Sequence, residues 1–328
     1  MLPLFIIVVF GAASYSRNLV WREGLSLWED VAVKSPEKAR AHNNLANVYG
    51  ELGLKDRAVE GYKKALGKYP EFAGFHVNLG NAYKAQGRTE EAAAEYEKAL
   101  ELEPDNVMAH NNLGTLYREA AMFDEAVREF QEALGLAPDN PGIHYNLGYA
   151  YEGKGLIDEA VTEYERAVEI SPGMAEPHNS LGNIYSRHGR TDAAVSEYLL
   201  AVKYKPGYAE AYNNLANVYK EKGLAVEARA AYRKAIEIRP EFAEARHNLA
   251  SLYVRMGRVE EGIAEYRRAI ELKPVAVFHY SLARALEAAG SGDEAAAHYS
   301  EFIEASPEAY RPQVEEAKKR LELLSGKP

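Results

Sequence analysis

The sequence predicts an all-α protein built as an α-solenoid, in which one helical hairpin is copied eight times along the chain. The first observation is a series of prolines at one constant interval, which chance does not produce. The second is an apolar pattern with helical spacing that recurs between them. The prolines are Pro36, Pro70, Pro104, Pro138, Pro172, Pro206, Pro240 and Pro274, and Pro307 comes one position earlier than the interval requires.

The first helix of each unit is predicted from a stripe of apolar residues. In the first unit, Leu45, Val48, Tyr49 and Leu52 stand at i, i+3, i+4 and i+7. A glycine then ends the helix, because glycine tolerates the left-handed conformation at the C′ position. Ala121 replaces this glycine in the third unit. The glycines are Gly53, Gly87, Gly155, Gly189, Gly223, Gly257 and Gly290.

The second helix begins near an acidic residue, which suits the positive end of a helix dipole. Its apolar stripe is represented by Ala58, Tyr62, Ala65 and Leu66. The proline closes the unit, since the residue before proline is biased away from helix. The acidic residues are Asp56, Glu90, Asp124, Asp158, Asp192, Glu260 and Asp293.

Two kinds of side chain recur at positions that we interpret as core. Small residues allow the two helices of a hairpin to approach closely. Tyrosines fill two further positions, such as Tyr49 and Tyr62, and we interpret these rings as core. The small residues are Gly or Ala at 46, 80, 114, 148, 182, 216, 250 and 283, and alanines at 58, 92, 126, 160, 194, 228 and 295.

This pattern resembles the tetratricopeptide repeat, a unit that contains an aromatic, Leu-Gly, Tyr, Ala, a second aromatic, Ala and Pro in that order. The resemblance covers residues 39 to 307. Local departures are His in place of the first aromatic in most units, Gly262 in place of an alanine, and Leu286 and Phe302 in the last unit. The resemblance implies a right-handed superhelix in which the first helix of each hairpin lines the concave face.

The expected organisation has four parts. Residues 1–21 form an apolar N-terminal segment, 22–38 the second helix of an incomplete first repeat, and 308–328 a capping helix, which a solenoid needs at its end. Between them lie eight units: 39–72, 73–106, 107–140, 141–174, 175–208, 209–242, 243–275 and 276–307.

Composition limits the classes of function. Hydrophobic residues make up 47% and charged residues 27% of the chain, which predicts a folded protein. The formal net charge of −10 argues against nucleic-acid binding, which draws affinity from basic residues. The chain has no cysteine, so disulfides and thiolate metal sites are excluded and the redox compartment stays open.

Residues 2–13 (LPLFIIVVFGAA) are apolar or small, and Arg17 and Arg22 follow them. The run is shorter than the roughly 20 residues of a membrane-spanning helix, and it lacks the positive start of a signal peptide. A membrane anchor, a signal peptide and a buried assembly contact all remain open. Because of this segment, we favour a membrane-associated or exported protein over a purely cytoplasmic one.

No arrangement of residues predicts catalysis, a cofactor or a metal. Six histidines occupy one repeat position, one repeat apart, whereas a metal or acid–base site needs different groups that converge. We interpret these histidines as packing or local hydrogen-bonding residues. They are His42, His76, His110, His144, His178 and His279.

Asparagine gives the candidate binding site. It is a middling helix former, so its recurrence in the middle of a helix needs a reason. One interpretation is a hydrogen bond that ties adjacent repeats. The other is a resemblance to the asparagine ladder of O-GlcNAc transferases, which implies amides that hold the backbone of an extended peptide. The first row is Asn44, Asn78, Asn112, Asn146, Asn214 and Asn248, with Ser180 and Ser281 in the other units, and the second row is Asn47, Asn81, Asn183 and Asn217.

Three hypotheses for function follow. The first is a non-catalytic scaffold for a protein or peptide segment. The second is a structural protein that assembles head to tail, because similar repeats stack on one another and such a contact does not close. The third rests on the stretch from Asn18 to Ala46, which resembles the junction between the last membrane helix and the repeats of tetratricopeptide-bearing membrane glycosyltransferases. Under this hypothesis the chain is the accessory, non-catalytic part of a membrane glycosyltransferase.

Overall fold

The structure is a computed structural model that describes residues 24–305 and 310–324. These residues form helices and turns, and no strand occurs among them. By their contacts the helices divide into two compact units, one ending at Ile170 and the other beginning at Ser171. Each unit is an α-solenoid, as the sequence predicts.

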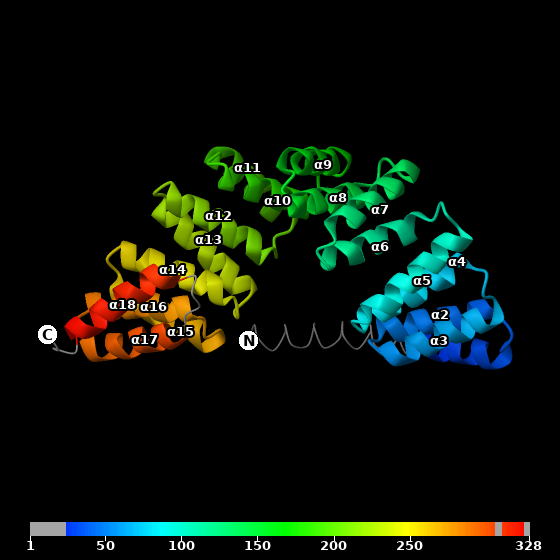
Figure 1. The fold of residues 1–328 in the computed structure, drawn as a ribbon, viewed down its shortest axis with the longest axis horizontal. Coiled ribbons are helices and arrows are strands. Elements are labelled where there is room, and N and C mark those ends of the chain that lie inside the picture. The colour runs from blue at the N-terminus through cyan, green and yellow to red at the C-terminus, as the bar shows by residue number, and fades with distance from the viewer. Residues whose placement is uncertain (1–23, 306–309, 325–328) are drawn as a thin grey trace, which may run out of the picture. The chain divides into compact units, whose positions relative to one another are not determined.

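Unit 1 starts with a helix at 24–34 and continues with four helical hairpins (Figure 1). We call the first helix of a hairpin the A helix and the second the B helix. The A helices are α2 (Ala39–Glu51), α4 (Ala73–Ala85), α6 (Val107–Glu119) and α8 (Pro141–Lys154). The B helices are α3 (Lys55–Lys68), α5 (Thr89–Leu102), α7 (Phe123–Leu136) and α9 (Ile157–Ile170).

Unit 2 contains four more hairpins and a final helix. Its A helices are α10 (Ala175–Arg187), α12 (Ala209–Glu221), α14 (Ala243–Arg255) and α16 (Ala276–Ala288). Its B helices are α11 (Thr191–Tyr204), α13 (Ala225–Ile238), α15 (Val259–Leu272) and α17 (Gly292–Ala305). The final helix, α18 (Arg311–Leu324), packs on α17 and buries Ala317, as expected of a cap.

Each hairpin is closed by the turn that the glycines predict. The amide of Leu54 donates to the carbonyl of Tyr49 at 2.8 Å, which is the long bond of a Schellman motif. The intervening Gly53 has a φ of 74°, and the equivalent glycines of the other units lie within a few degrees of this value. The residue before the second repeat proline is outside the helical region, since Tyr69 has φ −146° and ψ 83°.

Ala121 adopts the same left-handed conformation, with a φ of 58°, and is the one residue other than glycine to do so in the described chain. The left-handed region costs a residue with a Cβ about 1–2 kcal/mol. We therefore expect Ala121→Gly to raise the free energy of unfolding. The gain should be about 0.5–1 kcal/mol, because glycine also adds entropy to the unfolded chain. Urea unfolding followed by circular dichroism measures it, and Gly155→Ala is the matched reverse change, expected to destabilise.

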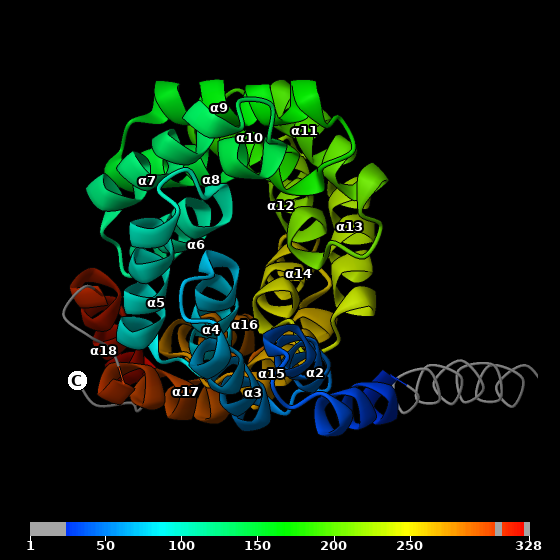
Figure 2. The same ribbon diagram turned by 90° about the vertical axis from the view of Figure 1, so that its right-hand side faces the viewer.

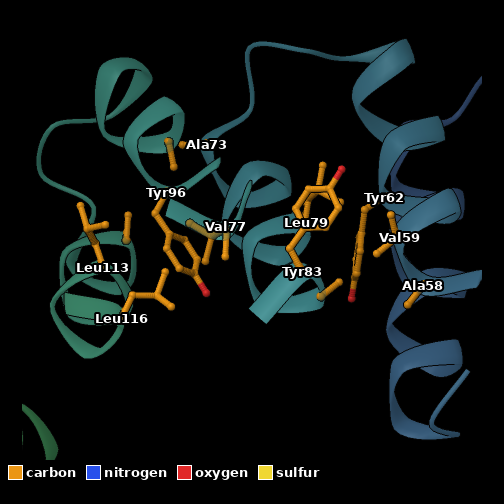
Figure 3. Packing of buried hydrophobic residues seen from close by; sticks show 14 of the residues in the cluster. Ala58, Val59, Tyr62, Ala73, Val77, Leu79, Tyr83, Tyr96, Leu113 and Leu116 are labelled. Atoms are coloured by element: carbon orange, nitrogen blue, oxygen red, sulfur yellow. The ribbon is translucent and has the colours of Figure 1, made fainter. Parts of the chain in front are cut away.

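The core runs between the two helices of each hairpin and on to the next hairpin. Figure 3 shows the ring of Tyr96 on α5 between Val77 of α4 and the pair Leu113 and Leu116 of α6. Tyr96 and the equivalent Tyr164 and Tyr232 are fully buried, which confirms the interpretation as core for the tyrosines of the B helices. The tyrosine position of the A helices is less buried, since Tyr49 is partly exposed. A Cβ at Gly80 would lie only 2.5 Å from the ring of Tyr96, so the ring would have to shift to admit a side chain there.

The A helices form the inner side of each unit. In unit 1, α4 contacts α6 and α6 contacts α8, and in unit 2 the same holds from α10 to α16. Successive B helices approach one another less closely. Figure 2 shows α6 and α8 inside α7 and α9, and α12 and α14 inside α11 and α13. The inner face of each unit is therefore made by its A helices.

Two predictions concern segments at the ends of the chain. Within the segment 22–38, where a helix is expected, the structure has a helix at 24–34, and Ala32 on it is buried. The apolar segment 2–13 lies outside the described residues. Among the residues that are described, no helix is both long and apolar enough to cross a membrane.

Candidate functional site

The first row of asparagines stands on the A helices, which form the inner face of each unit, and we call it the asparagine ladder. Each ladder side chain stands on an A helix and is partly exposed, in contrast to the buried leucine that follows it in most repeats. A side-chain amide that is only partly exposed can hydrogen-bond to a neighbouring residue and still be reached by a ligand. In unit 1 the ladder residues are Asn44, Asn78, Asn112 and Asn146, and in unit 2 they are Asn214 and Asn248.

The ladder amides of one repeat donate to the repeat before it. Asn78 Nδ2 donates to Asn43 Oδ1 at 2.9 Å, and Asn146 Nδ2 donates to Asn111 Oδ1 at 3.1 Å. In the repeat between them the acceptor is Asn81 Oδ1, at 2.9 Å from Asn112 Nδ2. Val77 stands where the usual acceptor would be. The hydrogen bond between adjacent repeats that the sequence suggested is therefore present.

Unit 2 repeats the same bonds. Asn214 Nδ2 lies 3.2 Å from Asn179 Oδ1 and 3.0 Å from Asn183 Oδ1, and Asn248 Nδ2 donates to Asn213 Oδ1 at 3.1 Å. Ser281, the last member of the row, lies 3.0 Å from His247 Nε2 through its Oγ.

The second row has a different task. Each of its four carbonyl oxygens accepts from the hydroxyl of a core tyrosine on the B helix of the same hairpin. A buried phenol needs such an acceptor, since an unsatisfied buried hydroxyl is costly. The pairs are Tyr62 with Asn47 at 2.6 Å, Tyr96 with Asn81 at 2.7 Å, Tyr198 with Asn183 at 2.7 Å, and Tyr232 with Asn217 at 2.5 Å. Burial raises the pKa of Tyr62 to about 12, so these hydroxyls remain donors.

The structure adds residues that the sequence analysis did not single out. The acceptors of the ladder, Asn43, Asn111, Asn179 and Asn213, stand one residue before it, and the Asn-Asn pairs were the signal. Arg118 also belongs to this face, since its guanidinium donates to Asn146 Oδ1 at 3.2 Å and lies 4.8 Å from the ring centre of the exposed Tyr149. A cation beside the ladder could not be placed from the sequence, because it comes from the preceding A helix.

Most of the repeated histidines form a local clamp, as interpreted from the sequence. In α4, His76 Nε2 lies 2.9 Å from the carbonyl of Pro70, and its Nδ1 lies 2.7 Å from Glu95 Oε2 on α5. His110, His144 and His178 repeat both contacts with Glu129, Glu163 and Glu197. Burial lowers the pKa of His178, but its bonds to Glu197 and Pro172 outweigh it and the net pKa is raised. Each imidazole therefore joins an A helix, a B helix and a loop.

Family models match almost every hairpin. Those described as tetratricopeptide repeat match residues 39–71, 114–175, 209–242 and 247–310, and one described as TPR repeat matches 80–120 and 182–223. The chain is a tetratricopeptide repeat protein. No curated protein matches this tetratricopeptide repeat protein over its sequence.

Solved structures share its fold. A chain of the APC/C hetero-tetramer Cut9–Hcn1 superimposes with a TM-score of 0.64 and 16% identity, over 81% of this chain and 52% of that one. A tetratricopeptide repeat protein from Parabacteroides merdae superimposes with a TM-score of 0.56 and 19% identity, over 77% of this chain and 98% of that one. The present chain thus spans about half the length of the first. At these identities the likeness concerns the fold alone.

Proposed function

We propose that this tetratricopeptide repeat protein is a non-catalytic scaffold that binds an extended polypeptide segment along its asparagine ladder. The observation that supports the proposal is that the ladder amides are held in place by bonds to the preceding repeat and yet stay partly exposed. Side chains that are already fixed lose little entropy when a ligand arrives, which favours binding.

The chemistry of the amide suits a peptide backbone. An asparagine side chain has two N–H donors and a carbonyl oxygen with two lone pairs. The inter-repeat bond of Asn78, Asn112 or Asn146 uses one donor. The other N–H can reach a peptide carbonyl, and the oxygen can accept from a peptide N–H. Recognition of this kind reads the backbone and tolerates many side chains, as the resemblance to O-GlcNAc transferases implies.

The spacing of the ladder also suits an extended ligand. Packed helices lie about 8–10 Å apart, and three residues of polyproline II chain rise about 9 Å. One amide per A helix can then meet every third residue of such a chain. Unit 1 has four ladder asparagines in succession, whereas unit 2 has Ser180 and Ser281 on either side of two. We therefore expect unit 1 to provide most of the affinity.

The expected result of Asn112→Ala is a loss of about 1 kcal/mol in partner affinity, and the same for Asn146→Ala, since each removes about one hydrogen bond. The partner is first identified by mass spectrometry of co-purifying proteins, with crosslinks that locate the bound segment. A fluorescent peptide of that segment is then titrated by anisotropy. Arg128→Ala, an exposed change on the outer helix α7, is the control. Unchanged affinity in the double variant would remove the ladder from the binding site.

Head-to-tail assembly is the second candidate. The first described helix of unit 1 exposes Leu27 by 57% and Val33 by 78%. A second copy could cover these side chains. Electron microscopy of the purified protein tests this candidate, and dispersed monomers would contradict it.

The third hypothesis, an accessory part of a membrane glycosyltransferase, depends on residues 18–46, of which 18–23 lie outside the described residues. Membrane association through 2–13 likewise remains a prediction.

A further inference from the structure

The hairpin of α16 and α17 breaks the pattern of the histidine clamp. In the clamp a glutamate stands 19 positions after the histidine, as Glu95 follows His76. In the last hairpin the residue 19 positions after His279 is a second histidine, His298. A carboxylate returns one helical turn later, at Glu301, on the same face of α17. Three potential ligands thus replace two.

The three side chains converge on one point. His279 Nδ1 lies 3.1 Å from His298 Nδ1 and 2.5 Å from Glu301 Oε2, and His298 Nδ1 lies 3.0 Å from the same oxygen. The two imidazoles are mostly buried, with side chains 13% and 19% exposed, whereas Glu301 is 55% exposed. The group therefore lies at the surface, where an ion can enter past the carboxylate.

The histidine clamp and this cluster differ in whether the imidazole Nδ1 atoms have a lone pair available for a metal ion. In the clamp, one imidazole faces one carboxylate, and a single shared proton satisfies both. In the last hairpin two Nδ1 atoms face each other and the same carboxylate. Two N–H groups directed at one another repel, so at least one ring presents a lone pair to the centre. Two imidazole lone pairs and a carboxylate make a donor set that suits a divalent transition metal ion.

We propose that His279 Nδ1, His298 Nδ1 and Glu301 Oε2 bind one divalent first-row transition metal ion with the coordination chemistry of zinc. A tetrahedral ion with bonds of about 2.1 Å separates its ligand atoms by roughly 3.4 Å. The Nδ1–Nδ1 separation of 3.1 Å and the His298–Glu301 separation of 3.0 Å are within about 0.4 Å of this value. The His279–Glu301 separation of 2.5 Å is shorter by about 0.9 Å, so the exposed Glu301 would have to move outward and the two rings would have to rotate slightly to admit the ion. The fourth position faces solvent, open to water or to a partner residue. The ion would join α16 to α17.

The full chain, purified without a polyhistidine tag and freed of metal with a chelator, is titrated with ZnCl2 by isothermal calorimetry. We expect one ion per chain. The decisive variant is His298→Gln, because glutamine can still hydrogen-bond His279 and Glu301 and should preserve the fold, while it removes an imidazole ligand and adds no carboxylate. Its affinity for Zn²⁺ should fall by about tenfold or more. Glu163→Gln is the matched control, because it changes the His144–Glu163 pair, which has no third ligand. It should leave the affinity for Zn²⁺ unchanged.

Two further measurements separate a metal site from a purely structural contact. Zn²⁺ should raise the melting temperature of the wild type and not that of His298→Gln, since an ion bound to the folded state stabilises it. Nitrogen NMR of the imidazoles should show the Nδ1 signals of two rings shifting on addition of Zn²⁺. Equal affinity in the wild type and in His298→Gln, or no shift of those signals, would overturn the proposal.

Discussion

Phe130→Ala is expected to lower the free energy of unfolding by about 3–5 kcal/mol, the usual range for a fully buried phenylalanine. Phe130 is completely buried in α7, and its ring lies against Gly114 of α6, where a Cβ would meet it at 2.9 Å. The close crossing of the two helices leaves no other side chain to fill the space. Truncation would leave a cavity as well as lose apolar contact. Urea unfolding followed by circular dichroism measures the change.

Phe130→Tyr is the matched control, because tyrosine fills this position in the other hairpins. Its hydroxyl would point toward Thr115, which stands where Asn81 accepts from Tyr96. We expect a change of less than about 1.5 kcal/mol. Hydrogen exchange should place the loss of protection in Phe130→Ala within α6 to α8, since a repeat contacts only its neighbours. Equal stability of the two variants would contradict this account of the core.

The second large effect is a loss of stability in acid that depends on His247. Burial, followed by the charge of Lys220, lowers the pKa of His247 to about 4. The ring is stacked on Phe278, with centroids 4.5 Å apart, and lies 5.2 Å from Tyr266. The folded state therefore favours the neutral imidazole, and unfolding releases it to bind a proton.

The sign follows from proton binding. Between about pH 6.5 and pH 4 the unfolded chain binds the proton and the folded chain does not, so stability falls as the pH falls through this window. A difference of about 2.5 pKa units corresponds to about 3 kcal/mol. His178 in the same unit acts in the opposite sense, since its raised pKa gives stability that is present below about pH 6.5 and lost as the pH rises through its folded pKa.

Urea unfolding of the wild type and of His247→Asn at a series of pH values isolates the contribution. Asparagine occupies this position in four other repeats, including Asn213 in the preceding one, so the variant should fold. The wild type should lose about 3 kcal/mol more than the variant between pH 6.5 and pH 4. Parallel curves for the two proteins would show that His247 is not the group responsible.

Much of the fold could be predicted from the sequence because its signals are local. The helical apolar period locates the helices, Gly53 ends the first of them, and the proline interval counts the hairpins. Each of these sequence signals depends only on residues within one turn or one hairpin. Because the hairpin occurs eight times, each signal is observed repeatedly and becomes reliable. Ala121 shows what the sequence could not predict. The sequence identifies Ala121 as the residue that replaces the turn glycine, but only the structure shows that it still adopts the left-handed conformation.

The candidate site could be predicted only in part. The recurrence of Asn44, Asn78 and their equivalents identifies a face, but their partners lie on the preceding A helix. Asn112 uses Asn81 because Val77 replaces the usual acceptor, but Asn214 lies within reach of both Asn179 and Asn183, which only the packing of the two helices shows. The position of Arg118 beside Asn146 has the same origin.

By itself the sequence determined the helical hairpin, the number of its copies, the tyrosine and alanine core and the row of asparagines. These properties follow from spacing along a single chain segment. The tertiary structure alone decided that the two rows have different partners, that His247 is held neutral, and that His279, His298 and Glu301 meet. Each of these depends on distances between residues of different helices, which helix packing sets and periodicity does not encode.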